Sequence, residues 1–328
     1  MNDDSRPASP LPTGLSIESC SARVTFCRNM SVVEVSMEAS SGAGDLCDGG
    51  GFLAALNRQL NLKRFDLSHR KCWALVIDQW GYPTAYLFWR VFWAKYHLGW
   101  SVYDWIDNTL NNERPATWLI YLTNWTYFLL LLDTIGQAFL VSFIMYRKPE
   151  MEVHVTPLYL KMAWLVYETV STASIMVTLL YFIFLYDGSM TLLSMAKHVF
   201  NSVYVLLDLG VTATPVRLMH FIYPAGYAVV YLCFTSFYWG VGGVNMDGEP
   251  YIYKVLDWSD PAQASLLGLS CVFGGVPAVH FLLWCLYMLR KTVYGQCVQT
   301  GPPPPLNVEQ NRVQRTLSAP LSTVTVIE

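Results

Sequence analysis

Two residues able to support nucleophilic chemistry lie where a membrane fold would bring them to similar depths. Thr123 is near the start of one apolar stretch, 118–146, and His198 is inside another, 190–210. At ~1.5 Å of rise per residue, Thr123 is expected ~7 Å and His198 ~12 Å below the outer ends of their helices. A neutral imidazole can accept the proton of a threonine hydroxyl as that oxygen attacks an ester carbonyl, and can return it to the leaving alcohol. The pair therefore predicts a threonine–histidine ester hydrolase site.

Each of these residues also has a purely structural interpretation. Threonine in a membrane helix commonly bonds back to its own helix, and a membrane histidine is often a packing residue with its hydrogen bonds satisfied. Asp208 lies ten residues beyond His198 on the same predicted helix, ~15 Å away, so a serine-protease type of triad is not predicted.

The two stretches have the pattern of membrane helices with one polar face. Residues 118–146 carry one formal charge, Asp133, and are long enough to cross a ~30 Å hydrocarbon layer. At ~100° per residue, the polar side chains of each stretch fall within an arc of roughly 100°. The first set comprises Thr123, Thr126, Asp133, Thr134 and Gln137, and the second comprises Ser194, Lys197, His198, Asn201 and Asp208. Both faces are expected to point into a bundle of helices.

The composition predicts an all-α, polytopic helical membrane bundle. Hydrophobic residues make up 53% of the 328 residues and charged residues only 14%, so a soluble domain would expose large apolar patches. The predicted spans are residues 83–104, 118–146, 158–186, 190–210, 217–239 and 264–289. A net charge of -3 argues against a nucleic-acid partner, and the eight cysteines show neither a disulfide framework nor zinc-site spacing.

Around this bundle, 83–291, the sequence predicts tails and one surface segment. Residues 1–59 and 292–328 are expected to be disordered tails, and 60–82 an amphipathic juxtamembrane segment. The positive-inside rule places both termini in the cytosol, because the outer loops near the membrane then hold only Arg114 and Lys254. The basic residues on the inner side are Lys63, Arg64, Arg70, Lys71, Arg147, Lys148, Arg217, Arg290 and Lys291. In the first span, Arg90 is expected to pack inside, and Lys95 and His97 to face water or partners.

A second set of polar residues is expected nearer the inner face. It comprises Asp133, Glu168, Asp208, His220 and His280. A proton or ion pathway and a metal site are open interpretations, but interhelical hydrogen bonds and ion pairs, such as Lys197 with Asp208 or a neighbouring carboxylate, are preferred. No metal or cofactor is predicted.

Several motifs carry a resemblance to a known family. They are YLTNW (Tyr121 to Trp125), YLFWR (Tyr86 to Arg90) with Trp80 before it, FLYDG (Phe184 to Gly188) and KHVFNSVYVLLDL (Lys197 to Leu209). Over about 80–294 the chain resembles the rolling stone family of membrane proteins. More distantly it is similar to the androgen-induced membrane hydrolases, which cleave fatty acid esters of hydroxy fatty acids with an intramembrane threonine and histidine.

The resemblance implies a site but also departs from it. Tyr121-Leu122-Thr123 matches the element that holds the hydrolases' threonine, and His198 stands ten positions before Asp208, as their histidine does before an acidic residue. The Asn-His-x-x-His-Thr setting of that histidine is replaced here by Met195-Ala196-Lys197-His198-Val199-Phe200. A cation beside His198 disfavours protonation of the imidazole.

Three functions follow as hypotheses. The first is an intramembrane hydrolase of lipid esters, with Thr123 as nucleophile, His198 as general base, a fatty acid ester as substrate and membrane lipids as partners. The second is a non-catalytic plasma-membrane protein acting in cell contact or myoblast fusion, the role that the resemblance to rolling stone implies. A transporter using Asp133, Glu168, Asp208 and His280 ranks behind both, because the chain shows no paired repeats. The sequence does not identify protein partners.

Overall fold

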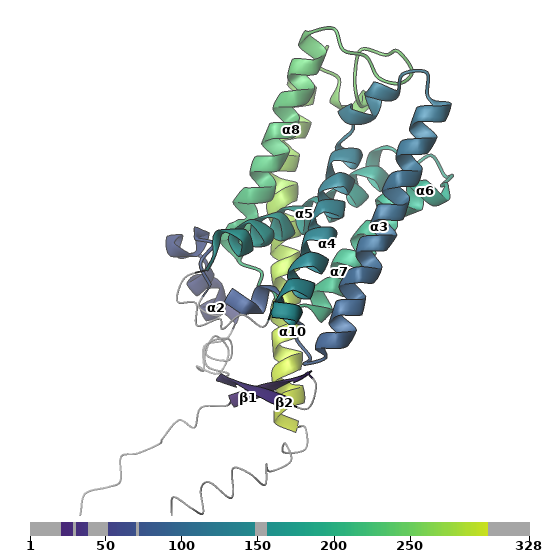
Figure 1. The fold of residues 1–328 in the computed structure, drawn as a ribbon. Coiled ribbons are helices and arrows are strands. Elements are labelled where there is room, and N and C mark those ends of the chain that lie inside the picture. Colours follow the sequence, from purple (N-terminus) through teal and green to yellow (C-terminus); the bar gives the residue numbers. More distant parts are fainter. Residues whose placement is uncertain (1–20, 29–30, 39–51, 70–71, 148–155, 301–328) are drawn as a thin grey trace, which may run out of the picture.

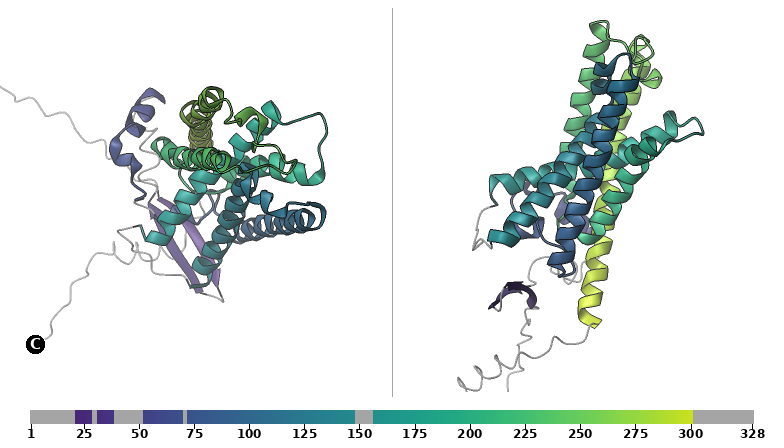
Figure 2. Two further views of the ribbon diagram at one scale, coloured as in Figure 1. Left: turned by 90° about the horizontal axis from the view of Figure 1, so that it is seen from above. Right: turned by 45° about the vertical axis from the view of Figure 1, so that its right-hand side comes forward.

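The computed structural model describes residues 21–28, 31–38, 52–69, 72–147 and 156–300. As predicted, the fold is all-α in character, with one small two-stranded ribbon beside the helices. Figures 1 and 2 show an elongated bundle in which α3, α8 and α10 run along the long axis. The loop between α8 and α9 lies at one end, here named the loop end, and the ribbon lies beyond the other.

The helices follow the predicted spans closely. The long ones are α3 (Pro83–Asn111), α4 (Leu122–Arg147), α5 (Leu158–Phe184), α8 (Ile222–Gly240) and α10 (Val276–Thr300). The fourth predicted span consists of α6 (Leu192–Met195), a π-helical segment (Ala196–Phe200) and α7 (Asn201–Val211). The sixth begins with α9 (Pro261–Ser270) and a second π-helical segment (Cys271–Gly275). Short 3-10 turns at Pro115–Ile120 and Leu218–Phe221 precede α4 and α8.

Four helical stretches are long and apolar enough to cross a membrane: Leu122–Tyr146, Leu158–Phe184, Leu218–Gly240 and Pro261–Gln296. The predicted number of six was therefore too high by this criterion. In the other two stretches, α3 and the helix around His198, charged side chains interrupt the apolar sequence. Arg90 of α3 and Asp208 of α7 are examples, and each is buried inside the bundle.

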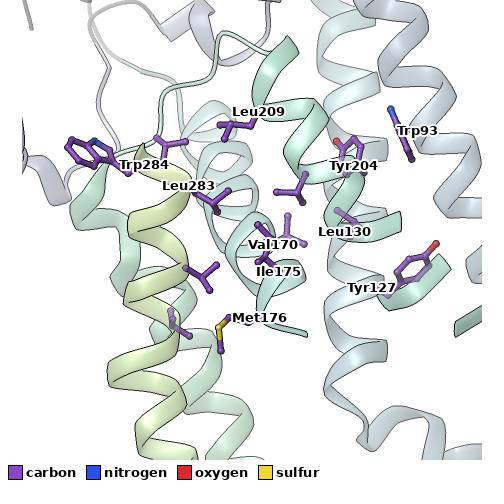
Figure 3. Packing of buried hydrophobic residues seen from close by; sticks show 14 residues of the cluster. Trp93, Tyr127, Leu130, Val170, Ile175, Met176, Tyr204, Leu209, Leu283 and Trp284 are labelled. Carbon is purple, nitrogen blue, oxygen red and sulfur yellow. The ribbon is translucent and has the colours of Figure 1, made fainter. Parts of the chain in front are cut away.

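Helix α5 forms the centre of the bundle. Of its most apolar window 61% is buried, compared with 28–33% in the other three stretches. Small and branched side chains such as Val170, Ser174 and Val177 allow this burial on several sides. Figure 3 shows Val170, Ile175 and Met176 packed among residues of α4, α7 and α10. This central helix fixes the positions of the helices around it.

Buried ion pairs join α3 to the helix around His198. Arg90 Nη1 lies 2.9 Å from Asp208 Oδ1, and Lys197 Nζ lies 2.8 Å from Asp104 Oδ2. The predicted burial of Arg90 is confirmed, and Lys197 pairs with a carboxylate other than Asp208. His97 was expected to face water or a partner, and that expectation is wrong: the ring is fully buried, stacked on Trp93 and hydrogen-bonded to Tyr127.

The amino-terminal region has more structure than predicted. Within the predicted tail 1–59, β1 (Ser21–Arg28) and β2 (Ser31–Glu38) pair antiparallel, with Ser21 opposite Glu38, and α2 (Phe52–Gln59) follows. The segment 60–82 forms 3-10 turns at Leu62–Phe65 and Cys72–Leu75. Residues 301–328 of the predicted carboxyl-terminal tail lie outside the described residues, whereas α10 continues to Thr300.

Contacts hold the segment 60–82 against the bundle. Cys72, Leu75 and Val76 pack with Trp164 and Tyr167 of α5 in a second apolar cluster. The Arg217 guanidinium donates to the carbonyls of Asp66 and Ser68, and the Tyr223 hydroxyl donates to the Phe65 carbonyl. The segment is therefore an integral part of the fold.

Candidate functional site

An apolar cavity of about 130 Å³ lies between α4, α5, α8 and α9, towards the loop end. Its walls are mainly aliphatic and aromatic, for example Met176 and Leu180 of α5, Leu232 of α8 and Leu267 of α9. The loop between α8 and α9 contributes three residues to the wall: Tyr253, Val255 and Leu256. Such a space suits an apolar ligand or the apolar part of one.

The cavity depends on two local features of the helices that border it. Gly268 of α9 faces α8, and a Cβ at this position would stand 2.4 Å from Leu232 Cδ1, so a larger residue would displace the Leu232 side chain. Directly after α9, the π-helical segment Cys271–Gly275 gives Cys271 and Val272 to the wall. Segments of this kind are frequent at functional sites.

Thr123, the predicted nucleophile, lines this cavity at the amino-terminal end of α4. Tyr253, which also lines the cavity, lies next to this end of the helix. The backbone N–H of Leu122 donates to the hydroxyls of both Tyr253 and Tyr231, at 3.0 Å each. The Tyr231 hydroxyl donates in turn to the Ile120 carbonyl at 2.8 Å. These three hydroxyl groups, from Thr123, Tyr231 and Tyr253, are named the hydroxyl cluster below.

The phenol of Tyr253 is held in its protonated form. The residue belongs to the loop between α8 and α9, and its burial against the end of α4 raises its pKa to about 12. At physiological pH the group is therefore a hydrogen-bond donor and not a phenolate. A second hydroxyl pair, Thr126 with Tyr227 at 3.1 Å, lies further along the same wall.

His198, the predicted general base, reaches the cavity only through another residue. Its ring stacks on the ring of Tyr181, with centroids 3.9 Å apart and planes at 13°, and it is Tyr181 that lines the cavity. His198 lies in the π-helical segment, and its buried Nδ1 has no hydrogen-bond partner among the described residues. The described residues show no hydrogen bond between Thr123 and His198.

A different threonine and histidine do form a hydrogen bond. Thr172 Oγ1 lies 2.9 Å from His280 Nδ1, and His280 Nε2 lies 2.9 Å from the Arg217 carbonyl. Because a carbonyl only accepts, Nε2 carries a proton toward Arg217. The Thr172 hydroxyl also donates to the Glu168 carbonyl at 3.1 Å, so its one proton is shared between that carbonyl and Nδ1. Both side chains are fully buried, and neither lines the cavity. This pair is a structural link between α5 and α10.

The inner polar residues separate into two groups. Glu168 Oε1 accepts from Trp164 Nε1 at 3.1 Å and from the Arg217 backbone N–H at 3.2 Å, and it lies 3.3 Å from His220 Nδ1. Together with His280, this group connects α5, α10 and the 3-10 turn that precedes α8. Asp133 and Asp208 lie elsewhere, on α4 and α7, and Asp208 pairs with Arg90. Hydrogen bonding and ion pairing between helices, the preferred interpretation, describes these contacts. No group of three or more His, Cys, Asp or Glu side chains in the described part of the chain is arranged to hold a metal ion.

Sequence reasoning missed the tyrosines of the site. The wall is completed by the rings or hydroxyl groups of Tyr181, Tyr231 and Tyr253. The first two do not interrupt the apolar pattern of their helices, and Tyr253 lies in a loop. The one available signal was the acidic and aromatic character of the loop 240–263. In the structure this loop contacts the bundle: Arg114 donates to the Asn245 carbonyl, and Trp258 Nε1 donates to Thr235.

Comparison with known proteins identifies one family. The family model described as "Protein rolling stone" matches residues 46–300. The curated protein named "Protein rolling stone" from Drosophila melanogaster is 26% identical over 260 residues, which covers 73% of this chain and 91% of that protein. No solved structure matches significantly. The matched residues include every long helix and the whole cavity, so this chain, a multi-pass membrane protein, belongs to the protein rolling stone family.

Proposed function

We propose that this membrane protein binds the acyl chain of a lipid in the cavity between α4, α5, α8 and α9, and hydrolyses an ester of that lipid at Thr123. The observation that carries the proposal is the position of Thr123, which lines a mainly apolar cavity. A chain in that cavity brings an ester at its end beside the threonine hydroxyl. The orientation assigned from the basic residues, with both termini in the cytosol, makes the loop end extracellular and the substrate one of the outer leaflet.

In the proposed hydrolysis, Thr123 is the nucleophile and His198 is the general base. Thr123 Oγ1 attacks the ester carbonyl carbon as its proton passes to His198, and the alcohol leaves with that proton. Water then attacks the acyl-threonine as the same imidazole accepts its proton, the bond to Thr123 Oγ1 breaks, and the imidazole returns the proton to that oxygen as the fatty acid is released. Tyr253, protonated and bound to the Leu122 N–H next to Thr123, is placed to donate to the carbonyl oxygen as negative charge develops there.

Tyr181 controls the approach of His198 in this scheme. Its ring is stacked on the imidazole and forms part of the cavity wall, so proton transfer requires the ring to turn aside when substrate binds. Hydrogen bonds of catalytic groups are often completed only in the substrate complex. The free Nδ1 of His198 agrees with a base that awaits a partner.

The test is turnover of fatty acid esters by purified protein, with Thr123→Ala and His198→Ala compared with two controls. Thr126→Ala removes the other threonine hydroxyl of the cavity, and Thr172→Val breaks the buried threonine–histidine pair. Loss of turnover in the first two variants and its retention in the controls supports the proposal. Turnover that survives Thr123→Ala refutes the assigned nucleophile.

A protein that binds lipid but shows no turnover against any ester would favour the second hypothesis, a non-catalytic protein of cell contact or fusion. In that case Thr123 and Tyr253 are binding groups, and cell-based fusion assays replace hydrolysis as the measure of function. Thr123→Ala would then weaken lipid capture without any enzymatic activity to lose.

A further inference from the structure

We infer that the cavity selects lipids whose polar end carries no charge, such as a glycerol ester or a long-chain alcohol, over fatty acids and lysophosphatidates. This inference rests on the proposed lipid-binding function and specifies the ligand class. Its basis is the chemistry of the cavity wall, in which polar atoms are confined to hydroxyl groups and one thiol.

No Asp, Glu, Lys, Arg or His is among the described residues that line the cavity. The buried cations of the bundle are already engaged at other places: Arg90 with Asp208, Lys197 with Asp104, and Arg290 with the carbonyls of Leu209 and Thr214. A carboxylate or phosphate drawn into the cavity would lose its hydration without gaining a countercharge. An uncharged polar end avoids that penalty.

The hydroxyl cluster has hydrogen-bonding capacity that fits one neutral oxygen. The Tyr231 proton is used by the Ile120 carbonyl, and the Leu122 N–H is shared by Tyr231 and Tyr253. The hydroxyl protons of Thr123 and Tyr253 remain, and either can be donated to a ligand, which suits an ester carbonyl or an alcohol oxygen.

The apolar part of the wall supports the same ligand. Most of the remaining lining residues are aliphatic or aromatic, for example Met176, Leu180 and Val276. A single acyl or alkyl chain with one oxygen-bearing end matches this composition. A charged group on the chain would find no charged partner among the described lining residues.

The experiment uses the full chain in mixed micelles with a monoacylglycerol that carries a photoreactive diazirine in its acyl chain. Unlabelled competitors of the same chain length are the monoacylglycerol, the fatty alcohol, the fatty acid at pH 8 and the lysophosphatidate. The uncharged competitors are expected to displace the probe at concentrations at least ~10-fold lower than the charged ones. Equal displacement by charged and uncharged competitors overturns the inference.

Three variants test where the selectivity resides. Leu256→Arg adds a cation to the loop wall of the cavity and is expected to raise competition by the fatty acid by ~10-fold. Lys254→Ala removes an exposed charge that does not line the cavity and should leave the order of competitors unchanged. Tyr253→Phe should weaken competition by the fatty alcohol and the monoacylglycerol relative to competition by an alkane of equal length. A change of order in Lys254→Ala would place the polar end outside the cavity and overturn the inference.

The site of probe attachment separates this inference from the function on which it rests. Labelled peptides from α4, α5 or α8 together with equal displacement by all competitors refute the selectivity and leave lipid binding intact. Labelling that no competitor displaces, with no attachment at the cavity wall, refutes the proposed lipid-binding function itself.

Discussion

Replacing Asp208 by Asn is expected to destabilise the bundle much more than replacing Asp133 by Asn. Asp208 Oδ1 accepts from Arg90 Nη1 at 2.9 Å and from Trp89 Nε1 at 2.8 Å, and the Arg90 and Asp208 side chains are each 1% exposed. Asparagine keeps an acceptor for Trp89 but leaves the guanidinium without a counterion. Removing one partner of a buried pair typically costs about 3 to 5 kcal/mol.

Asp133 is the matched control because it is equally buried but less engaged. Its Oδ2 has no hydrogen-bond partner among the described residues, so the neutral amide should change the free energy of unfolding by no more than ~1 kcal/mol. The assay is thermal unfolding in detergent, read by loss of the monodisperse peak. At ~2 to 4 °C per kcal/mol, Asp208→Asn should lower Tm by at least ~6 °C.

The double variant Arg90→Met/Asp208→Leu separates charge from packing. It removes both charges, so it should recover at least half of the loss of Tm seen in Asp208→Asn, although the Tyr86 hydroxyl then loses its partner Arg90 Nη2. Equal Tm values for Asp208→Asn and Asp133→Asn would refute the reasoning, as would a double variant less stable than the single one.

Three further predictions concern other parts of the fold. Arg217→Leu should release the segment 60–69, since it removes the guanidinium that donates to the Asp66 and Ser68 carbonyls. Limited proteolysis between α2 and α3 should then become at least ~10-fold faster. An unchanged rate would show that apolar packing alone holds the segment. Gly243→Ala should lower Tm by a few degrees, because its Cβ would meet the Tyr238 ring at 2.4 Å; an unchanged Tm would show that the ring moves freely. Burial raises the pKa of Cys72, so less thiolate is present at pH 8 than in the unfolded chain. Maleimide labelling of Cys72 should therefore be slow until a denaturing detergent unfolds the protein. Rapid labelling of the folded protein would contradict the packing of this segment.

Local pattern was sufficient to predict most of the helices and the burial of their polar faces. Spans were readable because an apolar stretch of membrane length has few alternative structures. The polar face of α4 was readable because an ideal helix advances ~100° per residue, and Thr126, Asp133, Thr134 and Gln137 are all buried. Arg90 was assigned to the interior for the same reason: a charge within an apolar helix needs a partner.

The site could be predicted less well because it depends on partners far apart in the sequence. Thr172 and His280 are 108 residues apart, and nothing local indicates that they meet. The π-helical segment Ala196–Phe200 changes the angular advance of the helix around His198, so a wheel drawn at a constant angle does not give the direction of its ring. Tyr253 comes from an irregular loop in which no periodicity exists to be read.

His97 illustrates how aromatic surroundings defeat a polarity argument. Its sequence neighbours include a lysine, and the polar side of α3 was expected to face water. In the fold its ring is enclosed by Trp93, Tyr127 and Tyr204, from α3, α4 and α7. Stacking on one ring and edge contacts with two others favour a buried imidazole that the sequence pattern alone does not indicate.

The most direct test of the account compares lipid capture by Ala228→Phe and Val229→Phe. Ala228 lines the cavity, whereas its neighbour Val229 is exposed on the outside of α8. The measurement is covalent labelling of each full-length variant by a lipid with a diazirine in its acyl chain, followed by mass spectrometry of peptides from α4, α5 and α8. The account predicts that Ala228→Phe removes most of the label from cavity-facing positions and that Val229→Phe leaves it unchanged. Equal labelling of the two variants would contradict the claim that the cavity is where this protein meets its lipid.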